Sequence, residues 1–388
     1  MPRWRLLELD HLSYPDFGAF RLAMLRRRAA GLLPDTLMLM RPRGPGFVYS
    51  YYLDPDTNID LDYCRAHDIP FVRTLAPGGA GYADNSSLLA AFWLEQDHPL
   101  IGGPTADCYR RVVGGVARAM GERFGITARY RPLNDLEIQG ADGIWRKPGF
   151  FSFSTQDRIT QYVFSLQVQP AEEGLLASVI KPPPEKFSDK QTKDAGERST
   201  SLSGEVGRDL DFAEVRGFVI DHMAREYGIE FVSGPLTADE QRSFEELRAQ
   251  FNDPRWLYDR SPRQRWTDVP SSWRLGRAVQ KIAGGPLLDV SVQVDGEILR
   301  DLLITGSLSV FPFLPQSPVH CLEAVLRDSL ADEAAIRSKT QAIFDAPGHQ
   351  FVGIGADDIA TALCKAVSLA RATADAGPDA LSTTGVTT

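Results

Sequence analysis

The stretch IPFVRTLAPGGAGYADN, residues 69–85, joins a short strand signal to a glycine-rich loop. The run IPFVR predicts a strand, and Gly78, Gly79 and Gly81 follow it closely. Bare backbone just past a strand can cradle a phosphate, cradle a carboxylate, or form an ordinary turn. The loop matches neither GxGxxG nor GxxxxGK[ST], so it supports neither dinucleotide nor P-loop chemistry. All three interpretations stay open at this point.

The bulk composition indicates a globular chain of more than one domain. A length of 388 residues exceeds what one hydrophobic core usually organises, so we expect two domains. The formal charge of −9 argues against a nucleic-acid partner, because such proteins present a basic face. Four scattered cysteines without CxxC spacing are typical of a reducing compartment. No apolar run approaches the roughly 20 residues of a membrane span, so we expect a cytoplasmic protein with no membrane partner.

Strand and helix patterns mix irregularly, which favours an α+β fold over a doubly wound sheet. The run LNDLEIQGADGIWRK, residues 133–147, predicts a hairpin that ends at Lys147. Helices are expected over residues 17–33, 106–125, 209–227 and 237–251, the last opening with a capping box of Thr237 and Glu240.

A segment rich in proline and charge, residues 252–273, interrupts all periodicity and predicts a domain boundary. Beyond it, residues 287–306 predict a hairpin with an Asp295-Gly296 turn. Helices are expected to start near Ser317, Asp332 and Gly355. We therefore expect a first domain over residues 1–262, a smaller α+β domain over 272–371, and a disordered tail over 372–388.

Lysines are unevenly distributed along the chain. Arginine is the usual cation, yet five of the eight lysines fall between residues 147 and 193. Lys147 stands between Trp145 and PGFF, and a cation in an apolar setting needs a partner. The alternative is that Lys147 extends along Trp145 with its ammonium in water. The lysines from Lys181 onward interleave with acidic residues, so they form either a solvated loop or a set of functional cations.

Several catalytic arrangements are absent from the sequence. The six histidines show no HExxH spacing, which disfavours zinc hydrolysis, and there is no GxSxG. No cysteine lies between Cys108 and Cys321, so the central region offers no thiol nucleophile for an acyl-enzyme. Asn134-Asp135 is either a metal or nucleotide contact or ordinary turn chemistry.

The order of these elements resembles the lipoate–protein ligase A family, within the broader biotin/lipoate protein ligase superfamily. The segments VRTLAPGGAGYADN, LNDLEI, WRKPG, IKPPPEKFSDKQTK, RSTSL and FNDPRWLYDRSP follow one another as that family's glycine loop, Asn-Asp, KxSG, lysine-rich and closing motifs do. The resemblance covers residues 3–370 as an ordered series. It implies that residues 1–262 form a mixed-sheet catalytic domain and residues 272–371 an accessory domain.

The resemblance also implies a two-step reaction that uses ATP and Mg²⁺. A carboxylic acid, lipoate or a related acid, attacks the α-phosphate of ATP to give an acyl-adenylate and pyrophosphate. An amine, either a lysine of a lipoyl-type carrier domain or a small amine, then takes the acyl group and releases AMP. Lys147 corresponds to the catalytic lysine and Asp135 to the metal ligand. The residues expected to bind nucleotide or acyl-adenylate are Arg73, Gly78, Gly79, Ala80, Asp84, Asn134, Asp135 and Lys190.

The chain departs from the family motifs at several positions. Thr74 replaces an arginine, Ala83 replaces a histidine, and Phe150 and Phe151 bring bulk where the family has small residues. These departures put the identity of the acid in doubt more than adenylation itself. The alternatives are an amide synthetase that uses the same chemistry on a free amine, and a non-catalytic paralogue that binds a lipoyl carrier or an acyl-adenylate. The missing central cysteine disfavours an octanoyltransferase.

The proline-rich stretch 181–201 is expected to be a lid that orders over the adenylate, since it lacks apolar periodicity. Limited proteolysis should cut there first, and ATP plus the true acid should protect it. Equal cleavage with and without these ligands would count against a lid.

Overall fold

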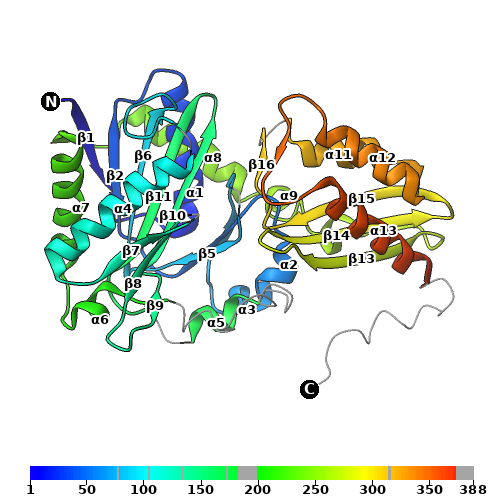
Figure 1. The fold of residues 1–388 in the computed structure, drawn as a ribbon, viewed down its shortest axis with the longest axis horizontal. Helices are drawn as coiled ribbons and strands as arrows, with labels where there is room; N and C mark the ends of the chain where they lie inside the picture. Colours follow the sequence, from blue (N-terminus) through cyan, green and yellow to red (C-terminus); the bar gives the residue numbers. More distant parts are fainter. Residues whose placement is uncertain are drawn as a thin grey trace.

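A six-stranded mixed sheet forms the centre of the N-terminal part of the chain (Figure 1). The computed structural model describes residues 1–76, 78–103, 105–132, 134–171, 174–181, 199–312 and 316–372. β1 is parallel to β2 and β12, whereas the other neighbouring pairs are antiparallel. In spatial order the strands are β10 (Gly149–Gln156), β11 (Ile159–Gln167), β6 (Ser87–Glu95), β2 (Thr36–Met40), β1 (Arg3–Glu8) and β12 (Glu230–Ser233). The expected mixed-sheet α+β fold is confirmed.

Helices cover both faces of this sheet, and β6 shows why its sequence is continuously apolar. Leu89, Ala91 and Trp93 pack toward α1 (Tyr14–Ala29) and α8 (Ala238–Phe251). The alternating residues of β6 pack toward α4 (Thr105–Phe124) and α7 (Phe212–Tyr227) on the opposite face. Successive side chains of a strand point to opposite faces, so a strand covered on both sides is apolar throughout.

The expected helices are present with shifted ends. α1 begins earlier than expected because Ser13 caps it, accepting a hydrogen bond from the Asp16 amide at 3.1 Å, and Pro15 occupies the first turn. It ends at Ala29, just before Gly31, whose φ of 72° leaves the helical region. The predicted capping box of Thr237 and Glu240 is formed.

Two smaller three-stranded sheets lie beside the central one. The first contains, in spatial order, β4 (Phe71–Arg73), β3 (Gly46–Tyr49) and β5 (Ala80–Ala83); the second contains β7 (Ala128–Arg131), β8 (Asp135–Gln139) and β9 (Trp145–Arg146). The β8–β9 pair is the predicted hairpin. Short helices connect these parts: α2 (Pro55–Asn58), α3 (Leu61–Ala66), α5 (Leu175–Val179) and α6 (Leu202–Val206).

The C-terminal region contains a separate antiparallel sheet. Its spatial order is β13 (Arg274–Lys281), β14 (Leu287–Asp295), β15 (Ile298–Gly306) and β17 (Ser329–Leu330). The predicted β14–β15 hairpin turns at Gly296, whose φ is 59°. The three expected helices are α11 (Pro318–Leu326), α12 (Glu333–Phe344) and α13 (Ala356–Ala372), and β16 (Val310–Phe311) pairs with β18 (Gln350–Phe351).

The segment between the two sheets is more ordered than its sequence indicates. It contains α9 (Pro254–Leu257) and α10 (Pro262–Arg265), capped by Asp253 and Ser261. Pro254 and Pro262 each start a short helix, where the missing amide hydrogen costs nothing, whereas Pro270 lies outside the helices. The boundaries at 262 and 272 stay a prediction, and the expected tail lies outside the described residues from position 373 onward.

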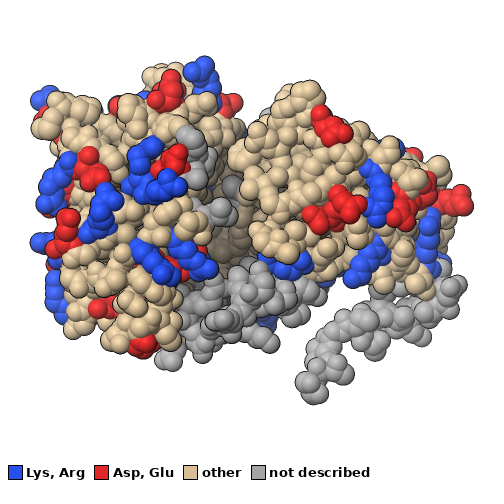
Figure 2. All heavy atoms as spheres, viewed as in Figure 1, with Lys and Arg blue, Asp and Glu red and all other residues tan. Residues whose placement is uncertain are grey.

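Surface charges are largely paired. Figure 2 shows basic and acidic side chains interspersed on the face in view. On α4 and α7, Arg118 meets Glu226 at 3.0 Å, and Arg208 meets Glu214 at 2.7 Å beside the start of α7. None of the helices in the described part of the chain is both long and apolar enough to cross a membrane.

A buried carboxyl beside α2 links the stability of the protein to pH. The Asp54 side chain caps α2 and accepts from the Asp56 amide at 3.1 Å, and the residue is 4% exposed. Burial, together with the nearby Asp289 and Asp56 carboxylates, raises the pKa of Asp54 to about 7, although its own cap bond and Arg277 oppose the shift. The folded state therefore holds a proton that the unfolded state releases at lower pH.

We expect the free energy of unfolding to fall as pH rises from about 4 to 7, by about 1.4 kcal/mol per unit of raised pKa. Asp54→Asn should flatten this dependence and raise the melting temperature at pH 8, because asparagine also caps helices well. Thermal melts of wild type and Asp54→Asn at pH 5 and pH 8 measure this pH dependence. Asp62→Asn is the control, because the Asp62 side chain is exposed. An unchanged pH dependence in Asp54→Asn would show that another group is responsible.

Candidate active site

The lysine singled out by the sequence is paired with the acid singled out beside it. Lys147 directly follows β9, and Asp135 opens β8, so the hairpin register brings them together. Lys147 Nζ lies 2.6 Å from Asp135 Oδ2, with the side chains 30% and 23% exposed. The ring of Trp145 is covered by the Arg129 guanidinium, 3.7 Å from the ring centroid. The partner that the Lys147 ammonium was expected to need is therefore the Asp135 carboxylate.

Backbone contacts join Lys147 to the segment at residues 199–200. Its carbonyl oxygen accepts from the Thr200 amide at 2.9 Å, and it forms a parallel bridge with Ser199. Asn134 Nδ2 donates to the Phe151 carbonyl oxygen at 2.6 Å, tying the start of the hairpin to β10. These bonds fix the hairpin against β10 and leave the two charged side chains partly exposed.

The two phenylalanines after Lys147 point in opposite directions. Phe151 is 1% exposed and stacks on Phe164 in the core, with ring centroids 5.3 Å apart. Phe150 faces Tyr14 instead, with centroids 6.5 Å apart. The expectation that both add bulk at the site is therefore wrong for Phe151, because alternation along β10 sends it to the other face.

Gly149 allows β10 to approach β11 closely. Its φ is 157°, and a Cβ atom there would lie 1.8 Å from the Ser165 carbonyl oxygen. We expect Gly149→Ala to lower the free energy of unfolding by about 1–3 kcal/mol, since one backbone must move. Urea denaturation measures this, with Gly217→Ala as control, because that helical position is open within 4 Å. Equal stability of the two variants would contradict the close approach.

A chain of hydrogen bonds connects Asp84 to the strand that follows Lys147. Asp84 is 5% exposed and accepts from the Ser86 amide at 2.9 Å and from the Tyr82 hydroxyl. The side-chain amide of Gln167 donates to Ser86 Oγ, and the backbone amide of Gln167 donates to the Pro148 carbonyl oxygen at 2.5 Å. Ser87 of β6 pairs with Gln167 of β11, and Leu166 pairs with Gly149 of β10. Asp84 and Lys147 therefore lie at the same end of the central sheet.

The glycine loop folds back onto the end of β3. Gly78 has a φ of 106°, which favours glycine, and the Gly79 carbonyl oxygen accepts from the Ser50 amide at 3.0 Å. Ala80 is the first residue of β5 and pairs with Tyr49. Gly81 lies against Tyr14, since a Cβ at that position would be 3.0 Å from its hydroxyl oxygen.

Arg73 supports this loop from inside the protein. It is 0% exposed, and its guanidinium donates to the carbonyl oxygens of Tyr51 and Leu257, each at 2.9 Å. Burial lowers its pKa, and the two tyrosine rings beside it lie 5.6 Å away. Its side chain is therefore bonded to the backbone behind the loop. Lys190 and most of the expected lid lie outside the described residues.

The structure thus brings Lys147, Asp135 and Asn134 together and places Asp84 at the same sheet end. Sequence reasoning missed Tyr14, Ser86 and Gln167, which complete this end of the sheet. Tyr14 precedes the helix expected over residues 17–33 and carried no signal of its own, and Gln167 is one polar residue at the end of an apolar strand. The contacts of Tyr14 with Gly81 and of Gln167 with Ser86 join segments far apart in the chain, so local sequence patterns do not reveal them.

The side chains at this site provide too few ligands to bind a metal ion unless a nucleotide supplies the others. Among the described residues, no group of three or more histidine, cysteine, aspartate or glutamate side chains is arranged to hold one. Mg²⁺ usually binds one or two carboxylates and takes its other ligands from phosphates and water. Asp135 fits that role as a single carboxylate, provided that it shares its oxygens with Lys147.

The two thiols in the N-terminal part of the chain, those of Cys64 and Cys108, are poor nucleophiles. Cys64 and Cys108 are buried, and burial raises the pKa of each to about 11. Such thiols are protonated at neutral pH. Cys321 and Cys364 belong to α11 and α13 of the C-terminal region.

Comparison with known proteins identifies the family. The model of the lipoyl protein ligase A/B catalytic domain matches residues 17–224, more than half of the chain. The chain belongs to this family, as its motif order indicated, and it is an enzyme of the group that contains lipoate ligases and octanoyltransferases.

The relatives include both kinds of enzyme. The octanoyltransferase LipM of Moorella thermoacetica is 23% identical over 270 residues, covering 66% of this chain and 97% of its own length. The lipoate-protein ligase A subunit 1 of Thermoplasma acidophilum is 25% identical over 215 residues, covering 52% of this chain and 75% of its own length.

Solved structures share the fold. The bi-partite lipoate protein ligase of Thermoplasma acidophilum gives a TM-score of 0.55 at 22% identity, covering 66% of this chain and 97% of its own. LipL1 of P. falciparum, solved in complex with lipoate, gives 0.67 at 12% identity, covering 93% and 99%. The likeness to LipL1 therefore extends through the C-terminal sheet.

Proposed function

We propose that the protein is an AMP-forming acyl ligase. In the first step a carboxylate oxygen attacks the α-phosphorus of ATP, and the bond to the departing pyrophosphate breaks. In the second step an amine attacks the acyl carbon, and AMP leaves with the carboxylate oxygen. The observation that carries this proposal is the Lys147–Asp135 pair, 2.6 Å apart and partly exposed at the end of the central sheet.

Lys147 is proposed to hold the carboxylate and the α-phosphate together. A fixed ammonium stabilises the negative charge that develops on the transferring oxygens. Asp135 keeps the ammonium in place before ligands bind, and it would be the protein carboxylate nearest to Mg²⁺ when ATP carries that ion. Gly78, Gly79 and Ala80 would let the adenylate approach the backbone, with Arg73 supporting the loop from behind.

Cysteine placement favours a ligase over an octanoyltransferase that uses a thiol. The chain has no cysteine between Cys108 and Cys321, and buried Cys64 and Cys108 are held as thiols by their raised pKa. Transfer through an acyl-thioester requires a reactive thiolate beside the acyl group. ATP activation needs no such residue.

The acceptor is proposed to be a lysine on a lipoyl-type carrier domain. The likeness to the Thermoplasma ligase, which was solved as part of a lipoylation system with its E2 lipoyl domain, supports this choice. The second possibility is a different acid with a free amine as acceptor, because Phe150, whose ring faces Tyr14, stands where the family has small residues.

A pyrophosphate-release screen tests the proposal. The protein is incubated with ATP, Mg²⁺ and lipoate, octanoate or other carboxylic acids, first alone and then with a lipoyl domain or small amines. Release that depends on one acid, followed by acyl transfer to the lipoyl domain, supports the ligase. Transfer to an amine without any protein acceptor supports the amide synthetase. Tight binding without release supports the non-catalytic paralogue and overturns the proposed activity.

A further inference from the structure

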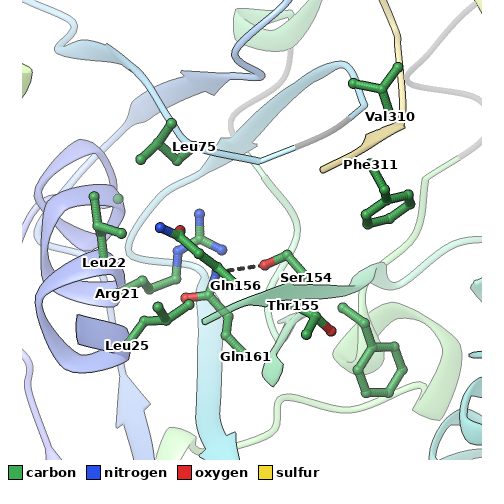
Figure 3. Close-up of a pocket in the computed structure, with 12 residues that line it drawn as sticks. Arg21, Leu22, Leu25, Leu75, Ser154, Thr155, Gln156, Gln161, Val310 and Phe311 are labelled. Atoms are coloured by element: carbon green, nitrogen blue, oxygen red, sulfur yellow. Dashed lines mark hydrogen bonds between the residues drawn. The ribbon is translucent and has the colours of Figure 1, made fainter. Parts of the chain in front are cut away.

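The cleft between α1, the β10–β11 hairpin and β16 is lined partly by apolar and partly by polar side chains. It has about 580 Å³ of empty space, part of it open to solvent. Small-molecule sites commonly measure roughly 300–1,000 Å³. Leucine, valine and phenylalanine side chains form the apolar part. Figure 3 shows a polar group beside them, made up of Arg21, Ser154, Gln156 and Gln161. A ligand that fills the cleft therefore meets polar atoms as well as apolar ones.

Arg21 lies in this cleft without a counter-charge. Among the described residues it forms no ion pair and no side-chain hydrogen bond, and its Nε atom is shielded from water without a partner. Burial lowers the pKa of its guanidinium, although the nearby Tyr14 opposes the shift. Arg28 of the same helix, by contrast, pairs with Asp35 at 2.8 Å. A buried cation without a partner is costly, and a bound anion would remove that cost.

Gln161 is a second group in the cleft whose hydrogen bonding is incomplete. It is 5% exposed, and its Oε1 atom is buried without a partner. Its Nε2 atom donates to Ser154 Oγ at 2.9 Å. A hydroxyl donates as well as accepts, so turning the amide over would let Ser154 donate to Oε1 and would free the NH2 group. That group would then be a donor for an acceptor bound in the cleft.

The polar part of the cleft lies away from Lys147, at a distance that an acyl chain spans. The Tyr14 and Phe150 rings, with centroids 6.5 Å apart, mark the Lys147 end, since Phe150 follows Lys147 closely in the chain. From that contact to Arg21, α1 advances about 10 Å, at 1.5 Å per residue. β10 advances about 10 Å as well, at 3.3 Å per residue, before Phe153 lines the cleft. A linear chain of eight carbons, with bonds of about 1.5 Å, is roughly 9 Å long.

We infer that the acid activated by this protein is a linear dicarboxylic acid, whose far carboxylate binds Arg21 while its near carboxylate reacts at Lys147. The inference rests on the adenylation proposed above. The near carboxylate attacks the α-phosphorus of ATP and pyrophosphate leaves, whereas the far carboxylate is unchanged. A guanidinium holds a carboxylate through two parallel hydrogen bonds. Leu22 and Leu75 line the cleft, where they would contact the chain between the two ends. An acid with a hydrocarbon end would leave Arg21 buried and unpaired, so it is disfavoured.

Pyrophosphate release with ATP and Mg²⁺ tests the inference by comparing octanedioate with octanoate, which has the same chain and no far carboxylate. We expect octanedioate to have a kcat/KM at least about tenfold higher in the wild-type protein, the effect of one charge-assisted contact. Arg21→Met should lower kcat/KM for octanedioate at least about tenfold and leave that for octanoate unchanged or higher. A misfolded variant would lose both activities instead. Arg26→Gln, at an exposed position of the same helix, should keep the wild-type preference.

Calorimetric titration with both acids in the absence of ATP separates this inference from the proposed activity. If no acid in the screen supports release, the adenylation proposal fails. Tighter binding of octanedioate that Arg21→Met removes would still support the role of Arg21. The inference is overturned if octanedioate does not bind. It is also overturned if octanoate or the monomethyl ester of octanedioic acid binds as tightly, because the far charge would then play no part.

Discussion

Lys147→Ala is expected to lose acid-dependent pyrophosphate release by a factor of about 10²–10³, by analogy with the loss of a preorganised donor to an oxyanion. The ammonium is already positioned by Asp135, 2.6 Å away, so no reorganisation is needed when the phosphate arrives. Lys147→Arg should rescue poorly, because a planar guanidinium does not replace a compact ammonium. Single-turnover pyrophosphate release with the acid identified by screening measures both variants.

The fold should survive this change. The pair is partly exposed, with side chains at 30% and 23%, so its loss costs within about 1 kcal/mol. Lys339→Ala is the control, because Lys339 belongs to α12 of the C-terminal region, where its ammonium donates to the Val325 carbonyl oxygen at 2.7 Å. That variant should keep full activity. If Lys147→Ala retains a tenth of wild-type release with an unchanged melting temperature, the adenylation site lies elsewhere.

Local patterns predicted the parts of the fold that depend on neighbouring residues. The Asp295-Gly296 turn, the capping box at Thr237 and the hairpin before Lys147 are each specified within about twenty residues of chain, and all three form. β1 was not predicted. It is stabilised by pairing with β2 and with β12, more than two hundred residues away, and no local pattern reports such a partner.

In the candidate site, too, local patterns marked the residues, whereas their contacts depend on distant parts of the chain. Lys147 and Asp135 were found because a hairpin and a motif order mark them. Their pairing depends on hairpin register, which the sequence leaves unspecified. Arg73 stood in the motif, but its contacts with Tyr51 and Leu257 are long-range and turn its side chain inward. A motif gives the position of a residue in the chain, whereas packing decides where its side chain points.

The C-terminal region is connected to the glycine loop through the tyrosines after β3. Tyr51 and Tyr52 pack in the C-terminal core, and the Tyr51 carbonyl oxygen accepts from Arg73. The Ala76 carbonyl oxygen in the loop accepts from the Tyr51 amide at 3.1 Å. A change in the position of the C-terminal region would therefore be transmitted to the glycine loop by Tyr51. The contacts that hold the C-terminal region in place thus affect the geometry of the candidate site.

A buried ion pair also joins the segment after α9 to α11 of the C-terminal region. Arg260, 1% exposed, donates to Glu323 at 2.9 Å and to the Ile304 carbonyl oxygen at 2.8 Å. Glu323 also accepts from the Ile304 amide at 2.7 Å. Burial alone would lower the pKa of Arg260, but the Glu323 carboxylate more than offsets this and the pKa is raised.

Arg260→Met is therefore expected to lower the free energy of unfolding by about 3–5 kcal/mol, because it leaves the Glu323 carboxylate buried without a counter-charge. The double variant Arg260→Met/Glu323→Leu should recover much of this loss, since an apolar pair of similar volume avoids the desolvation of both charges. Urea denaturation of the full-length protein measures each variant. Arg337→Met is the control, because its ion pair with Glu333 is 38% and 66% exposed and should be worth no more than about 1 kcal/mol. If the single variant is as stable as the control, the buried pair contributes no more to stability than an exposed one, and the charge of Glu323 must be relieved by water.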